Sequence, residues 1–258
     1  MNLHCGLGWR GEPYDVAAAI GRLDAEVICL QEAWLPEPAP AAVAAGGGSE
    51  PHVDAVAAAA SRLGAALYRV PQRSGMRLAD IGLHSSGPAG RASGDFCQAV
   101  LTTLPVTSYE VYALGQPPCD PLPRLAQVIC LRLSNGANFR IVNTHLTHRL
   151  TSPVQLGALW RYLRRRPGPT LIAGDLNMPR LIAGRLAGFE PAVSGRTWPA
   201  WQPWIQLDHL LASRDVATIA GSVLPPAGSD HFPVRATIAI SPGSRQDMAE
   251  RRHSQADG

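Results

Sequence analysis

The sequence predicts an α/β fold in which two mixed β-sheets pack face to face and helices cover their outer sides. With 46% hydrophobic and 17% charged residues, a chain of 258 residues is an ordinary globular protein with a sizeable core. Short apolar runs alternate with segments of helical periodicity throughout the chain. Turn-forming stretches such as Ser134-Asn135-Gly136 join several of the runs, which indicates hairpins within the sheets.

Helical periodicity defines the expected helices. In the first segment, Val16 and Ile20 recur at the spacing of one helix face. The second segment ends at Gly64, because glycine readily takes the left-handed conformation of a helix C-terminus. The third is stopped by Pro167 and Gly168. We therefore expect helices at residues 14–23, 53–63 and 152–166, and a short helix after Pro179.

Apolar runs of strand length predict the sheets. The expected strands are residues 26–32, 65–70, 96–103, 106–114, 126–133, 138–146, 170–174, 205–211, 219–224 and 234–240. Residues 71–94 are rich in Gly, Ser and Arg and predict a long surface loop. Residues 241–258 are polar and aperiodic and predict a disordered tail, which leaves a single domain at 1–240.

The composition narrows the class of protein. A net charge of +3 is too small to predict nucleic-acid binding by itself, although all 23 basic residues are arginine, whose forked group suits phosphate. The five scattered cysteines indicate a reduced, cytoplasmic compartment and neither a disulfide framework nor a zinc site. No apolar stretch approaches the ~18 residues of a membrane span.

The strand that runs into Gly174 is followed by the most informative polar residues of the chain. Asp175 and Asn177 stand two positions apart, so on a continued strand they would project from one face. A carboxylate and an amide held together can orient and deprotonate a water or hold a phosphate oxygen. A plain turn explains the same residues, because Gly, Asp and Asn are turn formers.

Polar residues also end two other apolar runs. Asn143 and His145 share a strand face, and His145 is either an active imidazole or a histidine satisfied within the core. Glu32 ends the apolar run at residues 26–32, and it is either a solvated strand terminus or a ligand for a hard metal ion.

The last such residues lie near the C-terminal end of the domain. Asp208 and His209 end an Ile/Leu run within the expected strand at 205–211, and a bend after Gly228 could present both Asp230 and His231 to a common centre. A histidine whose tautomer is fixed by a separate aspartate is the usual arrangement of an active imidazole. Together with Glu32, these groups are oxygen donors and imidazoles without thiolates, which favours Mg²⁺ or Mn²⁺ over zinc.

These residues form a series of motifs that resembles the endonuclease/exonuclease/phosphatase superfamily, the DNase I-like phosphoesterases. Any one motif is weak, but six in the same order are a specific signal, and they extend over residues 2–240. The motifs are Asn2-Leu3-His4, Leu30-Gln31-Glu32, Asn143-Thr144-His145-Leu146, Gly174-Asp175-Leu176-Asn177, Leu207-Asp208-His209 and Ser229-Asp230-His231-Phe232-Pro233.

The resemblance implies a four-layer α/β sandwich and hydrolysis of a phosphoester with a divalent metal. By position, Glu32 would be the principal metal ligand, with Asn2 and Asp230 near the ion. Asp175 would activate or orient the attacking water, and Asn177 would help to hold it.

The resemblance also implies roles for the remaining polar residues. His145 would contact the phosphate or assist the leaving group, and His231 would act at the scissile phosphate with Asp208 fixing its ring. Either the aspartate or the histidine could be the general base. The family normally has a full strand before its first asparagine, so we expect a longer natural N-terminus; without it, Asn2 would be poorly anchored and neighbouring strands unpaired.

The expected function is therefore that of a monomeric, Mg²⁺-dependent phosphodiesterase, and a nuclease before other substrate classes. A phosphatase or sphingomyelinase-like enzyme is the alternative within this chemistry, and a non-catalytic binding module on the same scaffold is the alternative outside it. Trp198, Trp201 and Trp204 follow one another among prolines; they either stack a base or lipid headgroup or cover a sheet edge, and we favour the second.

Overall fold

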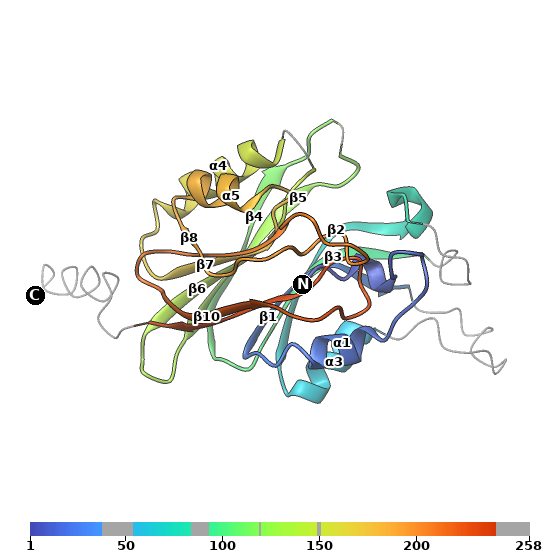
Figure 1. Cartoon of the computed structure of the whole chain (residues 1–258). Helices are drawn as coiled ribbons and strands as arrows, with labels where there is room; N and C mark the ends of the chain where they lie inside the picture. The colour runs from blue at the N-terminus through green and yellow to red at the C-terminus, as the bar shows by residue number, and fades with distance from the viewer. Residues whose placement is uncertain (38–53, 84–92, 119, 149–150, 241–258) are drawn as a thin grey trace, which may run out of the picture.

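The computed structural model describes residues 1–37, 54–83, 93–118, 120–148 and 151–240. The expected disordered tail lies outside these residues. The described strands form a six-stranded mixed sheet, a three-stranded sheet and a two-stranded sheet (Figure 1). Within the described part of the chain, no helix is long and apolar enough to cross a membrane.

The six-stranded sheet has the order β4-β5-β6-β7-β9-β8. Its β6 and β7 run parallel and the other neighbours antiparallel, so α4 serves as the crossover between the parallel pair. The strands are β4 (Val106–Gly115), β5 (Arg124–Arg132), β6 (Asn138–His145), β7 (Thr170–Asp175), β8 (Glu190–Pro191) and β9 (Asp208–Ala212).

The two smaller sheets are antiparallel, with the orders β1-β3-β2 and β10-β11. Their strands are β1 (Val27–Pro36), β2 (Ala66–Arg77), β3 (Ser93–Thr102), β10 (Ala217–Val223) and β11 (Val234–Ala239). The helices are α1 (Val16–Gly21), α3 (Ala55–Leu63), α4 (Ser152–Leu163) and α5 (Arg180–Ala187), with short 3₁₀ turns η1 (His4–Gly6) and η2 (Leu78–Ile81).

Local sequence accounts for the ends of the first helices. The side chains of Asp15 and Asp54 accept hydrogen bonds from the backbone N–H groups in the first turns of α1 and α3. Gly64 caps α3 in the left-handed conformation, as the sequence predicts. Figure 1 shows α1 and α3 on one side of the molecule and α4 and α5 on the other.

Three apolar clusters connect these elements. One lies between α1, α3 and the sheet of β1 and β3; a second joins that sheet to β5, β6 and β7; the third lies between the six-stranded sheet and α4 and α5. Representative members are Ile20, Leu30 and Ala59 in the first, Val100, Ile129 and Leu171 in the second, and Leu156, Ile172 and Leu211 in the third.

Three sequence-based predictions of element boundaries are wrong. The first strand does not end at Glu32 but continues to Pro36 through a bulge. The first seven residues of the expected loop at 71–94 belong to β2, which pairs with β3 as far as Arg77, while residues 84–92 lie outside the described part of the chain. Asp208 begins β9 instead of ending a strand, because the ladder with β7 starts there.

A cavity of about 700 Å³ lies between β1 and β11. Its walls include Val27 and Cys29 of β1 and Val234 and Ile238 of β11. In the described ranges, β1 has a full strand neighbour, β3, on one side, and β11 has β10 on one side. The opposite edges of β1 and β11 line the cavity.

Candidate active site

The site is built around Asp175, at the end of the fully buried strand β7. Gly174 before it has a φ of +152°, and a Cβ placed there would lie 1.8 Å from the carbonyl oxygen of Thr144 on β6. Glycine is therefore required for β7 to approach β6 so closely. This close approach brings Asp175 level with His145, its register partner at the end of β6.

Asn177 reaches the site by a turn and not by a shared strand face. Its φ is +51°, and its backbone N–H donates to Oδ1 of Asp175 at 2.9 Å. Its Nδ2 donates to the carbonyl of Leu146 at 2.8 Å and lies 3.2 Å from Nε2 of His145. The Asp175–Asn177 motif is therefore a turn, and the same turn places the Asn177 amide in the site.

His145 lies between two carboxylates. Its Nε2 is 3.6 Å from Oδ2 of Asp175, and its Nδ1 is 3.7 Å from Oε1 of Glu32. Burial, and then the positive charge of Arg124, hold the pKa of His145 well below its ordinary value. The imidazole is therefore neutral at physiological pH and can serve as a hydrogen-bond partner without carrying charge.

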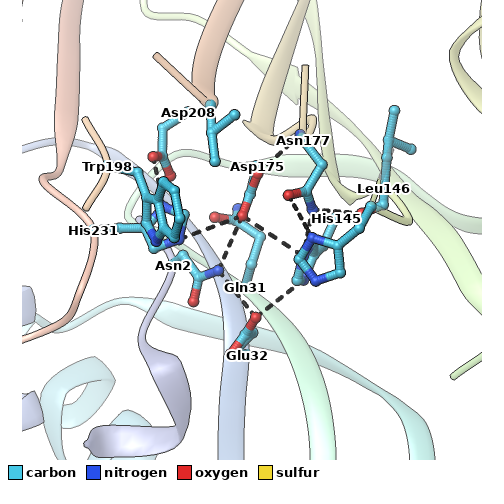
Figure 2. A network of polar contacts seen from close by, with 12 residues as sticks. Asn2, Gln31, Glu32, His145, Leu146, Asp175, Asn177, Trp198, Asp208 and His231 are labelled. Atoms are coloured by element: carbon cyan, nitrogen blue, oxygen red, sulfur yellow. Dashed lines mark hydrogen bonds and ion pairs between the residues drawn. The ribbon is translucent and has the colours of Figure 1, made fainter. Parts of the chain in front are cut away.

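Glu32 and Asp175 are bridged by the amide of Asn2 (Figure 2). Its Nδ2 donates to Oε1 of Glu32 at 3.1 Å and to Oδ2 of Asp175 at 3.2 Å, while its oxygen accepts from the backbone N–H of His4. A β-bridge to Gln31 holds the backbone of Asn2, and the residue is buried. The expectation that Asn2 would be poorly anchored is therefore wrong.

The bulge in β1 explains how Glu32 leaves the strand face. Its φ is +50°, at the point where the pairing of β1 with β3 shifts between Leu30 and Ala33. The neighbouring Gln31 points into the space between the sheets, where its Nε2 donates to Oδ1 of Asn143 at 2.6 Å. Asn143, predicted to accompany His145, therefore supports the site from beneath through buried hydrogen bonds.

His231 and Asp208 form the pair that the sequence predicts. Nδ1 of His231 is 2.8 Å from Oδ2 of Asp208, and Nε2 faces Oδ2 of Asp175 at 3.7 Å. Burial alone would lower the pKa of His231, but the carboxylates of Asp208 and Asp175 outweigh it and raise the pKa to about 10. The ring is therefore an imidazolium at neutral pH.

Asp175 and Asp208 differ in protonation behaviour although both are buried. Burial raises the pKa of Asp175 to about 6, against the opposing effect of His231. Burial acts in the same direction on Asp208, but the charge of His231 and its hydrogen bond hold the pKa of Asp208 below the ordinary value. Asp175 is thus the carboxylate that can exchange a proton near neutral pH.

Asp230 lies at the rim of the site. Its Oδ2 accepts from Nε1 of Trp198 at 3.3 Å, and its Oδ1 is 3.6 Å from Nδ1 of His4 and 4.0 Å from Nε2 of His231. Among the described residues, no three His, Cys, Asp or Glu side chains are arranged to hold an ion. The metal-binding role expected for Glu32, Asn2 and Asp230 therefore stays a prediction.

The donor set nevertheless fits a hard cation. Glu32 and Asp175 supply carboxylate oxygens on either side of the Asn2 amide, which presents its NH₂ group to both. Mg²⁺ keeps several water ligands and is usually bound through one or two carboxylates, so it needs no complete protein cage.

Sequence reasoning missed the contacts that His148 and Trp198 make with the predicted residues. Nδ1 of His148 lies 2.8 Å from Oδ1 of Asn177, and its only sequence signal is its position three residues after His145. Trp198 donates to Asp230, and its ring centroid is 6.4 Å from that of His231. Its aromatic neighbours drew attention to it, but nothing in the sequence places it against the imidazole.

The family assignment follows from the sequence match that accompanies this geometry. Residues 2–231 match the Endonuclease/Exonuclease/phosphatase family. The chain belongs to this family. The match covers all eight predicted site residues, and it makes the protein a phosphoesterase in its general chemistry. Among curated proteins, no significant sequence match is found.

Solved structures share the family fold at low sequence identity. An endonuclease/exonuclease/phosphatase protein from Beutenbergia cavernae has a TM-score of 0.67 and 19% identity, covering 93% of this chain and 70% of that one. A mannosyl-6-phosphatase from Bacteroides thetaiotaomicron has a TM-score of 0.61 and 15% identity, covering 87% of this chain and 89% of that one. The human Nocturnin catalytic domain with bound sulfate has a TM-score of 0.60 and 17% identity, covering 91% of this chain and 88% of that one. At such identities these likenesses establish the fold alone.

Proposed function

We propose that this family member hydrolyses phosphodiester bonds of nucleic acid with the help of a divalent cation. The observation that carries the proposal is the convergence on Oδ2 of Asp175 of three groups from distant segments (Figure 2). They are Nδ2 of Asn2 at 3.2 Å, Nε2 of His145 at 3.6 Å and Nε2 of His231 at 3.7 Å.

Asp175 is the group that we assign to the attacking water. Its pKa of about 6 leaves it ionised at neutral pH and still able to accept a proton. His231 is already protonated under these conditions, so it is suited to donate a hydrogen bond to the scissile phosphate while Asp208 fixes its ring. These charges favour Asp175 over His231 as the base, with Asn177 helping to hold the water.

The remaining residues act on the phosphate and the cation. Neutral His145 can donate a hydrogen bond to the phosphate or the leaving group. Glu32, with Asp230 nearby and Asn2 orienting it, would hold Mg²⁺ or Mn²⁺. When bound, such a cation supplies charge neutralisation for the phosphate.

We also infer that residues 1–240 form one catalytic domain with four layers. The support is the order of the apolar clusters, which runs from α1 and α3 through the two larger sheets to α4 and α5. In such an arrangement the site lies at the edge where β1, β6 and β7 meet, and the outer helices hold those strands in place.

Substrate turnover tests the catalytic assignment. We expect Mg²⁺-dependent hydrolysis of DNA or RNA that EDTA abolishes, and a kcat at least ~100-fold lower for Asp175→Ala, since loss of a general base typically costs 10²–10⁴-fold. Asp215→Ala is the matched control, because Asp215 is an exposed carboxylate in the turn after β9. Equal rates for Asp175→Ala and the wild type would remove the assignment.

Phosphatase activity is the second candidate. The fold shared with the mannosyl-6-phosphatase from Bacteroides thetaiotaomicron favours it. The same preparations should therefore be compared on phosphomonoesters, inositol phosphates and sphingomyelin. Hydrolysis of a phosphomonoester that exceeds that of every nucleic acid would replace the nuclease assignment while leaving the catalytic residues in place.

A further inference from the structure

Three exposed tryptophans and an arginine form a surface beside the site, which we call the aromatic ledge: Trp9, Arg10, Trp201 and Trp204. The tryptophan side chains are 43%, 53% and 62% exposed, respectively. Trp9 and Trp201 have ring centroids 5.0 Å apart, and the guanidinium of Arg10 lies 4.4 Å from the centroid of Trp9. The predicted cover of a sheet edge does not describe Trp201 and Trp204, because each residue is more than half exposed to solvent.

Trp198 connects the ledge to the catalytic residues. Its ring is in edge contact with both Trp201 and Trp204, at centroid distances of 6.3 Å and 6.1 Å. On its other side it donates to Asp230 and approaches His231. The ledge therefore begins at the rim of the site and extends outward from it, so a substrate whose phosphate lies at His231 would have its neighbouring groups beside these rings.

Backbone hydrogen bonds fix the part of the ledge that carries Trp201 and Trp204. Trp198 and Ile205 form a bridge that closes the short loop carrying Trp201 and Trp204. The backbone N–H of Ala200 donates to the carbonyl of Asp230 at 2.8 Å, so the loop is joined directly to the segment that carries His231. A platform held in place before binding loses little freedom when a ligand stacks on it.

The chemistry of the ledge favours a flat, anionic ligand. It combines indole faces with a cation and contains no aliphatic side chain; the exposed large aliphatic residues of the described chain lie elsewhere, such as Leu181 and Ile182 on α5 and Ile219 on β10. A surface that inserts into lipid would add such aliphatic groups. Aromatic rings with arginine are instead the usual means of holding unpaired nucleobases and their phosphates.

We propose that the aromatic ledge binds unpaired nucleobases next to the scissile phosphate, so that the substrate is single-stranded nucleic acid. This rests on the proposed nuclease function and adds the part of the substrate that is recognised. Trp201 and Trp204 supply the stacking faces, and Arg10 contributes positive charge for the adjoining phosphates.

Steady-state kinetics on a single-stranded oligonucleotide provide the first test. Stacking is typically worth 1–3 kcal/mol per base, or about 5- to 150-fold, so Trp201→Ala and Trp204→Ala should each raise KM roughly tenfold and leave kcat within about twofold. Trp201→Phe should retain most of the affinity because it keeps a ring. Trp160→Ala is the matched control, because Trp160 on α4 also pairs with an arginine, Arg164, at 5.0 Å. An unchanged KM in the ledge variants would overturn the proposal.

A comparison of substrates separates stacking from other effects. The ledge variants should match the wild type on an oligonucleotide of abasic nucleotides and on methyl p-nitrophenyl phosphate, a minimal phosphodiester. Equal losses on the abasic strand would show backbone binding and overturn the proposal. If the wild type cleaves the minimal ester but no oligonucleotide, both the proposed base binding by the ledge and the nuclease assignment are wrong, while the phosphoesterase chemistry stands. Failure on every ester would overturn the proposed function itself.

A binding measurement in EDTA tests the ledge without turnover. Titration with single-stranded DNA should quench the tryptophan fluorescence of the wild type and of Trp160→Ala. For Trp204→Ala, the apparent Kd from the same titration should be about tenfold higher. Vesicles of phosphatidylcholine with sphingomyelin should produce no quenching. Quenching by vesicles that is lost in Trp204→Ala, with DNA binding unchanged, would assign the ledge to a lipid surface and overturn the proposal.

Discussion

At the scale of single residues, the site depends on charges that burial alone would not allow. Asp175, Asp208 and His231 are all buried, and each would be costly to ionise in isolation. The contact between Asp208 and His231 keeps both charged, and it leaves Asp175 as the carboxylate with a raised pKa. One ion pair therefore sets the protonation of the whole centre.

The ion pair predicts how stability changes with pH. The pKa of His231 is about 10 in the folded protein and about 6.5 in an unfolded chain, so the native state binds the extra proton between these values. Its contribution to stability is complete below about pH 6.5 and is lost as pH rises through 10. Urea unfolding at intervals from pH 7 to 10, in EDTA, should show a steeper fall in unfolding free energy for the wild type than for His231→Gln. Parallel curves would contradict the assignment.

Gly174 is predicted to be irreplaceable for steric reasons. An added Cβ would lie 1.8 Å from a backbone oxygen of β6, and a φ of +152° is unfavourable for any side chain. We expect Gly174→Ala to lower the free energy of unfolding by about 3 kcal/mol, the upper end of the typical cost of steric conflict within a packed core. Gly157→Ala on α4 is the control, since its Cβ meets nothing within 4 Å and alanine favours a helix. Similar stabilities of the two variants in urea would refute the steric account.

At the scale of elements, a cavity separates the edges of β1 and β11. Both line the cavity of about 700 Å³, and the amino group of Met1 donates to the carbonyl of Cys29 at 2.7 Å beside it. The backbone N–H of Leu3 donates to the carbonyl of Gln31, and the N–H of Gln31 donates to the carbonyl of Met1, in parallel register. Burial lowers the pKa of the Met1 amino group, so a charge there is disfavoured.

An engineered extension before Met1 should stabilise the protein. About six alternating apolar and polar residues of high strand propensity would continue the parallel register along β1, pair with its free edge and replace the buried ammonium by a peptide bond. We expect a rise in Tm of several degrees, since ~1 kcal/mol corresponds to roughly 2–4 °C in a chain of this size. A Pro-containing extension of equal length is the control because proline cannot donate to the ladder. Identical Tm values for the two extensions would show that the cavity does not accept a strand.

Element boundaries show where local sequence is insufficient. Gly64 ends α3 as predicted, because a C-cap depends only on the conformation of that residue. Glu32 does not end β1, because pairing with β3 carries the strand through a bulge to Pro36. Similarly, the Gly- and Arg-rich sequence after Val70 suggested a loop, but pairing with β3 extends β2 to Arg77.

At the scale of the whole molecule, the sheets bring together residues that lie far apart in the chain. Asn2 contacts Asp175 across 173 positions, and Gln31 contacts Asn143 across 112. The described part of the chain also brings Asp230 to within 4.0 Å of Nε2 of His231 at the rim of the site.

The sequence alone determined the fold class, most of the elements and the identity of the polar residues, because apolar periodicity and short motifs are properties of neighbouring positions. Only the tertiary structure decided which nitrogen of His231 faces Asp175, how Asn2 bridges two carboxylates, and that the tryptophans project beside the site. The physical reason is that pKa values, hydrogen-bond directions and exposure depend on contacts between distant segments. No local pattern specifies those contacts.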